Sequence, residues 1–247
     1  MTSHISTDIA QGVMQISINR PEKKNALSQH MYRELTQALE QAQQDETVRV
    51  VLLTGTDSCF SAGNDLQDFL GGGELNEQHP TVQFLYKLAQ FNKPLVAAVA
   101  GLAIGIGTTA LLHCDLVYAA DNARFQLPFT QLGLCPEAAS SVLLPNVAGY
   151  QRAAQYLLLG EAFDAAAAMS MGMINQVVSP ADLMALARQK AEQLAALPAD
   201  AVQSSKALLK RTQIAHATET IAAELVQFQR LLHGSECQAR IAAFFKR

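Results

Sequence analysis

Glu137 is a single carboxylate inside an otherwise apolar stretch, and its position favours proton-transfer chemistry. It lies within residues 132–145, where its neighbours are mainly Leu, Ala, Pro and Ser. Between residues 96 and 160 the other carboxylates are Asp115 and Asp121, and both lie beside a predicted strand. Removal from water raises the pKa of a carboxyl towards neutrality, where a general base works best. Glu137 is therefore the leading candidate for a catalytic acid or base, and a loop glutamate at the start of a helix is the alternative interpretation.

Two glycine-containing turns could supply backbone hydrogen-bond donors. Residues 59–66, CFSAGNDL, follow a predicted strand and lead into a helix, and residues 101–109, GLAIGIGTT, repeat that arrangement. The first N–H groups of a helix have no partner within it, so each turn leaves free donors. If both turns met at one carbonyl oxygen, they would form an oxyanion hole. A structural interpretation is the alternative, because small residues are common at such turns and the glycines could allow close packing of helices. A phosphate-binding P-loop is not indicated, because its lysine is absent.

The segments around these residues alternate between strand and helix patterns. Short apolar runs predict strands, and apolar residues at helical spacing predict helices, with Ser28 as the cap of the first helix. The predicted order is a strand at 13–18, a helix from 28 to about 42, a strand at 48–54, a helix at 81–91, a strand at 95–99, a helix at 106–113, a strand at 116–119, helices at 150–159 and 165–171, and a strand at 174–178. This alternation indicates an α/β core with crossover connections.

From residue 180 onward the pattern is helical. Four helices are predicted, at 182–197, 199–212, 218–232 and 235–245. Charged residues make up 16% of the chain, below the average of roughly 25%, which indicates surface that is buried in an oligomer. The tail is therefore a candidate assembly module. Three consecutive glycines at 71–73 make residues 67–80 a predicted mobile loop.

Composition and charge argue against several classes of protein. The 247 residues are 49% hydrophobic with a formal net charge of −4, and scattered Lys and Arg argue against a nucleic-acid partner. The four cysteines form no CxxC pair and the six histidines no HxxxH pair, so we expect reduced core thiols and no metal site. No signal peptide and no continuous apolar run of about 20 residues is evident, which predicts a cytoplasmic protein without membrane association.

Taken together, these motifs resemble the enoyl-CoA hydratase/isomerase (crotonase) superfamily. The resemblance runs from about Val13 to the C-terminus and rests on the order and spacing of residues 61–66, Gly101 to Thr109, Cys114-Asp115, Phe125, Pro128-Phe129, Gly133 and Pro136-Glu137. It implies an α/β fold of the ClpP/crotonase type, a spiral of ββα units, with the active site within residues 1–180. It also implies that residues 181–247 form a C-terminal helical trimerisation region, which closes the active site and builds homotrimers, often stacked into hexamers.

The same resemblance assigns site residues one by one. It places the oxyanion-hole donors on the backbone N–H groups of Ala62 and Ile106, and it makes the substrate an acyl-CoA thioester, so no separate cofactor is expected. Residues 67–80 would line the acyl end. Lys24 and Lys206 could be phosphate contacts or ordinary solvated charges. The expected substrate-binding residues are Lys24, Ala26, Ser61, Gly63, Asn64, Asp65, Leu66, Gly105 and Phe129.

Two further family positions help to distinguish hydration from isomerisation. Hydratases of this superfamily use two glutamates, and these positions fall on Thr109 and Phe129, neither of which is an acid. A phenyl ring cannot transfer a proton, so a two-carboxylate hydratase is disfavoured. Residues 128–137, PFTQLGLCPE, instead resemble the peroxisomal-type Δ3,Δ2-enoyl-CoA isomerases and their bacterial relatives, whose single catalytic glutamate matches Glu137. The resemblance thus implies an enzyme that moves a 3-enoyl-CoA double bond to the 2-position, with Phe129 in an apolar wall.

Three alternatives are open at this point. The first is a hydratase in which Glu137 alone manages water addition to a 2-enoyl-CoA. The second is a non-catalytic acyl-CoA-binding homologue that keeps the fold without the activity. The third, a serine hydrolase using Ser61 or Ser140, is the weakest, because neither serine lies in a G-x-S-x-G turn and no histidine is clearly placed to activate it.

Overall fold

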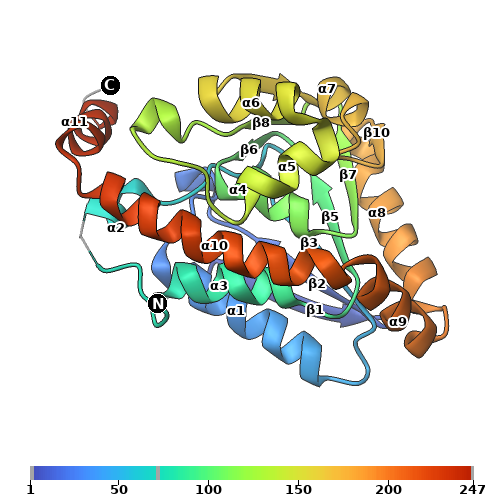
Figure 1. Cartoon of the computed structure of the whole chain (residues 1–247). Helices are drawn as coiled ribbons and strands as arrows, with labels where there is room; N and C mark the ends of the chain where they lie inside the picture. Colours follow the sequence, from blue (N-terminus) through green and yellow to red (C-terminus); the bar gives the residue numbers. More distant parts are fainter. Residues whose placement is uncertain (1–2, 71–72, 246–247) are drawn as a thin grey trace.

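The computed structural model describes residues 3–70 and 73–245, which form two sheets surrounded by helices (Figure 1). Gly71 and Gly72, part of the predicted mobile loop, lie outside the described residues. In spatial order, the larger sheet contains β1 (Ile5–Ala10), β2 (Val13–Ile18), β3 (Val50–Thr54), β5 (Leu95–Val99), β7 (Leu116–Ala120) and β10 (Gln176–Val178). The smaller sheet contains β4 (Cys59–Ser61), β6 (Leu102–Ile104), β8 (Arg124–Gln126) and β9 (Ala162–Asp164), also in spatial order.

Successive segments of the chain add one strand to each sheet. β3 is followed by β4, β5 by β6, and β7 by β8, and within each sheet these strands are parallel neighbours. After β4 come α2 (Leu66–Leu70) and α3 (Pro80–Gln90), and after β6 come α4 (Ile106–Thr109) and the 3-10 helix η2 (Ala110–His113). This repetition confirms the predicted spiral of ββα units.

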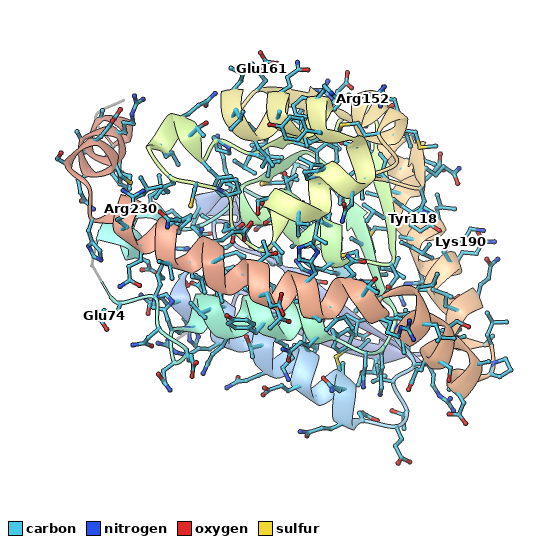
Figure 2. All side chains as sticks on the ribbon, in the orientation of Figure 1. Glu74, Tyr118, Arg152, Glu161, Lys190 and Arg230 are labelled. Carbon is cyan, nitrogen blue, oxygen red and sulfur yellow. The ribbon has the colours of Figure 1, made fainter. Side chains whose placement is uncertain are left out.

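Helices cover both faces of the larger sheet, because its central strands are apolar on both sides. Every residue of β3 and β5 is buried. One face packs into the main core with α1 (Gln29–Gln44) and α3. The other face packs against α8 (Pro180–Ala195), whose Leu183, Ala187 and Ala191 recur once per helical turn. Tyr118, labelled in Figure 2, lies on β7 and belongs to this second core, so the first helix of the tail is packed directly against the sheet.

The rest of the tail consists of α9 (Ala199–Leu209), α10 (Arg211–Leu232) and α11 (Ser235–Phe244). The long helix α10 contacts α3 and α5 (Ser140–Ala148), and Figure 1 shows it lying along α3. It begins at Arg211 and not at the predicted residue 218, because residues 213–217 contain no Gly or Pro that would break a helix. Two other helices are α6 (Tyr150–Leu159) and α7 (Ala165–Ser170), and two other 3-10 turns are η1 (Pro21–Lys23) and η3 (Thr130–Leu132).

The smaller sheet is the main feature that the sequence pattern did not predict. Each of its strands has three residues, which is too short to show the alternation that marks a strand. The predicted helix at 106–113 is divided into α4 and η2, whereas the strand at 95–99 and the helix at 150–159 have the predicted bounds. Among the described helices, none has the length and apolarity needed to cross a membrane.

Candidate active site

Glu137 lies in the loop between η3 and α5, and its carboxyl is enclosed. Only 4% of the residue is exposed. Its Oε1 accepts a hydrogen bond from the hydroxyl of Thr109, on α4, at 2.6 Å. Burial raises the pKa of Glu137 to about 8; the Thr109 hydrogen bond lowers it and the nearby charge of Glu224 raises it further. The prediction of a buried carboxyl is confirmed, and such a pKa lets the group accept and return a proton near neutral pH.

The two glycine-containing turns lie in direct backbone contact. Gly63 has a φ of +91°, and a Cβ added to it would lie 2.8 Å from the carbonyl oxygen of Ile104 and 3.9 Å from Cα of Gly105. A Cβ on Gly107 would lie 2.7 Å from the carbonyl oxygen of Ser61. Side chains at these two positions would separate the turns. The glycines therefore bring the end of β4 against the start of α4.

The hydrogen-bond pattern corrects one of the two expected oxyanion donors. The N–H of Ala62 donates to the carbonyl oxygen of Lys24 at 2.9 Å, so it is not free to bind a ligand. The assignment of Ala62 as a donor was wrong because its partner comes from a distant loop. Within the described part of the chain, the next N–H without a partner in this turn belongs to Asn64.

The backbone around Asn64 determines where its N–H points. Leu27 donates to the carbonyl oxygen of Gly63 at 2.8 Å and accepts from the N–H of Asp65 at 2.9 Å. In such a parallel bridge the N–H of the central residue points away from the partner strand. On the other turn, Ile106 is the first residue of α4, and its N–H has no partner among the hydrogen bonds of residues 3–70 and 73–245. Asn64 and Ile106 therefore present free donors on adjoining turns.

A cleft of about 840 Å³ runs past these turns. Arg240 and Ile241 of α11 and Phe228 of α10 add to its wall, so the C-terminal helices border the cleft. Ile106 and Glu137 are not part of its lining. The lining includes these predicted substrate-binding residues: Lys24, Ala26, Gly63, Asn64, Asp65, Leu66, Gly105 and Phe129.

A second, much smaller cavity of about 20 Å³ meets the cleft at Asn64, which lines both. Tyr32 of α1 lines the small cavity and donates its hydroxyl to Oδ1 of Asn64. Burial raises the pKa of Tyr32, and the negative charge of Glu137 raises it further. Glu137 is thus electrostatically coupled to Tyr32, whose hydroxyl bonds to the residue shared by the two cavities.

Two other expected contacts are not supported. The hydroxyl of Ser61 donates to the carbonyl oxygen of Asn25 at 2.9 Å and accepts from the N–H of Gly63 at 3.1 Å, and Ser61 does not line the cleft. Its side chain shapes the turn, which also weakens the serine hydrolase alternative. Lys206 is buried and pairs with Asp115 at 2.7 Å, so it is neither a solvated charge nor available to a phosphate group.

Tyr32, His113 and Glu224 lie around Glu137 or its loop and are not among the site residues predicted from the sequence. Glu224 carried a usable signal, because it lies among Ala222, Ala223, Leu225 and Val226 within a predicted helix. An acid with apolar neighbours is the same pattern that identified Glu137. Tyr32 and His113 have no comparable signal, since a Tyr or His on the apolar face of a helix is usually a core residue.

Comparison with known proteins agrees with this geometry. Residues 8–247 match the enoyl-CoA hydratase/isomerase family. The chain belongs to this family. The 1,2-epoxyphenylacetyl-CoA isomerase of Escherichia coli K12 is 38% identical over 208 residues, 80% of this chain and 78% of that protein. Enoyl-CoA delta isomerase 2 of Rattus norvegicus is 36% identical over 208 residues, 82% of this chain but only 53% of the rat protein.

Solved structures support the same family. The structure of Pseudomonas aeruginosa OdaA has a TM-score of 0.97 and 40% identity, with 100% of both chains covered. The enoyl-CoA hydratase/isomerase fold and the crotonase resemblance are therefore confirmed. The family includes both hydratases and isomerases. The two isomerases above are named for different reactions. The family alone therefore does not identify the reaction, and the residues of the site must indicate it.

Proposed function

We propose that this family member is an acyl-CoA double-bond isomerase that converts a 3-enoyl-CoA into a 2-enoyl-CoA. The observation that carries the proposal is the buried Glu137 carboxyl, whose pKa is about 8 and whose hydrogen-bond donor is the alcohol of Thr109. The second hydratase position holds Phe129, an apolar wall of the cleft. One carboxyl that accepts and returns the same proton suits an isomerisation, because no atom is added to the substrate.

In the proposed reaction, Glu137 removes a proton from C2 of the 3-enoyl thioester, and the electron pair moves to the thioester oxygen to form a dienolate. The N–H groups of Asn64 and Ile106 stabilise the negative charge on that oxygen. Protonated Glu137 then returns the proton at C4, and the electrons move back to give a 2,3 double bond conjugated with the thioester. The apolar part of the cleft wall, which includes Phe129, limits competition from water for the proton.

The cleft provides the basis for binding a CoA thioester. Lys23 and Lys24 bring positive charge to its lining, next to the turn that carries Asn64. The proposed partner is therefore the acyl-CoA substrate itself, without a further cofactor. We also expect a homotrimer or hexamer. Leu208, Leu209 and Val226 support assembly, because they leave 72%, 83% and 67% of their surface exposed on helices of the tail.

A product assay tests the proposed reaction. Purified protein is given matched trans-2- and trans-3-hexenoyl-CoA, and the products are separated by chromatography. We expect the 3-enoyl thioester to become the 2-enoyl thioester, with 3-hydroxyacyl-CoA formed at a far lower rate. Formation of 3-hydroxyacyl-CoA at a rate comparable with isomerisation would instead establish a hydratase. Binding of either thioester by calorimetry without turnover would establish a non-catalytic acyl-CoA-binding protein.

Thr109→Val should move the pH profile of the isomerase upward. In the wild type we expect kcat/KM to rise with pH through a midpoint of about 8, because Glu137 must be ionised to act as the base. The Thr109 hydroxyl lowers the pKa of Glu137, so its loss moves the midpoint above that value. A hydrogen bond to a charged group contributes about 1.5–3 kcal/mol, which corresponds to about one or two pH units.

At pH 7 the Thr109→Val enzyme should therefore lose about tenfold or more in kcat/KM, and the loss should shrink as the pH rises. Thr109→Ser is the matched control, because it keeps the hydroxyl donor and should keep the wild-type midpoint. Initial rates measured between pH 6 and 10 decide the outcome. An unchanged midpoint in Thr109→Val would show that this hydrogen bond does not tune the base.

A further inference from the structure

The backbone that follows Glu137 is held in an unusual conformation. Ala138 and Ala139 have φ values of 58° and 57°, so both lie in the left-handed region that residues with a Cβ rarely occupy. Both are buried, and α5 begins directly after them at Ser140. Two consecutive left-handed residues persist only where surrounding groups hold them in place.

Glu224, on α10, supplies several of these contacts. Its Oε2 accepts from the N–H of Ala139 at 2.7 Å, and its Oε1 accepts from the N–H of Ser141 at 3.0 Å and also from the Ser141 hydroxyl. Only 8% of Glu224 is exposed. Both carboxyl oxygens are thus engaged by the first turn of α5. Burial raises the pKa of Glu224, while the hydrogen bonds from Ser141 and Ala139 lower it.

The carbonyl groups of the same loop are also held. The Nε2 of His113, in η2, hydrogen-bonds to the carbonyl oxygen of Ala138 at 2.8 Å. Burial lowers the pKa of His113 to about 4, so the ring is neutral at pH 7 and this nitrogen carries the donated proton. The hydroxyl of Ser140 donates to the carbonyl oxygen of Glu137 at 2.6 Å. The loop is therefore fixed from η2, from α5 and from α10.

Among the described residues, side chains from α1, α4, η2 and α10 face the acid or its loop. Thr109 from α4 donates to the carboxyl, and Tyr32 from α1 is coupled to its charge. His113 is neutral and bonds to the loop. Glu224 is the acidic member of this set, and its negative charge raises the pKa of Glu137. It is also the one that comes from the C-terminal tail.

We propose that Glu224 is a positioning residue, which fixes the Ala139–Ser141 backbone and thereby aims the Glu137 carboxyl at the substrate. The inference rests on the proposed function, because it takes Glu137 as the proton-transferring group. A consequence is that α10 acts on the reaction through this side chain as well as through the wall of the cleft. Displacement of α10 would release the loop and move the base.

Glu224→Gln tests this role with little change in shape. The amide keeps one acceptor oxygen but places an NH₂ group against a backbone N–H, and it removes the negative charge. We expect kcat for the 3-enoyl thioester to fall about 10-fold to 10²-fold with little change in KM, because a misplaced base affects the chemical step. Glu219→Gln is the matched control, since Glu219 is exposed on the same helix and should behave as the wild type.

A second measurement needs no substrate. The protonated Glu137 carboxyl gives an infrared band that the Glu137→Gln variant lacks, and its loss with rising pH reports the titration of this one group. We expect the midpoint to fall in Glu224→Gln, because a negative charge that disfavours ionisation of Glu137 has been removed. This titration reports the charge of Glu224 beside Glu137. The position of the base is reported separately by kcat in a variant that keeps the charge.

Two further variants keep the test decisive if Glu224→Gln does not fold. Ser141→Ala removes one hydroxyl donor to Glu224 and should give a smaller loss of kcat. Glu224→Asp keeps the charge but shortens the reach, so it should lower kcat while the titration midpoint stays high. If Glu224→Gln keeps the kcat of Glu219→Gln, the proposal is overturned, whatever the titration midpoint. If the wild type isomerises nothing, the proposed function fails; if the wild type isomerises and Glu224→Gln keeps the kcat of Glu219→Gln, only the positioning role fails.

Discussion

Glu137→Gln should lower kcat for 3-enoyl-CoA isomerisation by about 10²-fold or more while leaving the fold intact, because the amide cannot accept or return a proton. Its oxygen can still accept the Thr109 hydroxyl that lies 2.6 Å from the native carboxyl. The lost group acts in the chemical step and the amide has nearly the same shape, so KM should change little. Steady-state kinetics with trans-3-hexenoyl-CoA measure both constants, and Glu219→Gln serves as the control on an exposed acid.

The same variant should also change stability in a pH-dependent manner. The ordinary pKa of 4.5 applies to the unfolded chain, and burial raises it to about 8 in the fold. The folded state therefore holds the proton more tightly, and this stabilising contribution is complete below pH 4.5 and lost as the pH rises through about 8. Above pH 8 the wild type carries a buried charge that the variant lacks. Urea unfolding at pH 9 should thus give Glu137→Gln the larger free energy of unfolding, with a smaller difference at pH 5.

Wild-type kcat in Glu137→Gln would remove Glu137 from the mechanism. If Glu137→Gln lost kcat but had a smaller free energy of unfolding than the wild type at pH 9, the raised pKa would be contradicted. Replacing a carboxyl of ordinary pKa would not stabilise the fold at that pH. The two measurements therefore separate the catalytic role of the carboxyl from its electrostatic state.

The acid could be predicted from the sequence because its signal is local. Glu137 has apolar neighbours along the chain, and these neighbours are what bury it. The oxyanion donor could not be predicted in the same way. Whether the N–H of Ala62 or of Asn64 is free depends on Lys24 and Leu27, which approach the turn from the loop before α1. Such contacts between distant segments are not visible in the local pattern.

The strands of the fold also differ in whether local sequence is enough to predict them. The strands of the larger sheet are continuous apolar runs, such as residues 95–99, so they could be recognised individually. β4, β6 and β8 exist because each follows a longer strand and pairs with its equivalents in neighbouring turns of the spiral. Glu224 likewise had a detectable pattern, but its partners Ala139 and Ser141 could be found only once α10 was placed against α5.

Gly63→Ala should lower kcat/KM by about 10²-fold or more, because it disturbs the proposed oxyanion hole without touching the base. The new Cβ would lie 2.8 Å from the carbonyl oxygen of Ile104, a rigid backbone atom, and the φ of +91° is unfavourable for alanine. The turn must move, and the N–H of Asn64 moves with it relative to that of Ile106. We expect a loss of stability of about 1–3 kcal/mol as well, from the strained backbone.

Gly172→Ala is the control that separates the steric clash from the backbone cost of a positive φ. Gly172 also has a positive φ, +78°, but its nearest new contact would be Cγ1 of Val147 at an ordinary 3.9 Å. It should therefore show the backbone cost without the clash, and its kcat/KM should stay within about twofold of the wild type, as for a substitution away from the site. Both variants are assayed at a temperature where circular dichroism shows them folded. If Gly63→Ala retained wild-type kcat/KM despite its clash, the contact between the two turns would serve packing alone. Stabilisation of the dienolate would then have to come from groups other than the N–H donors of Asn64 and Ile106.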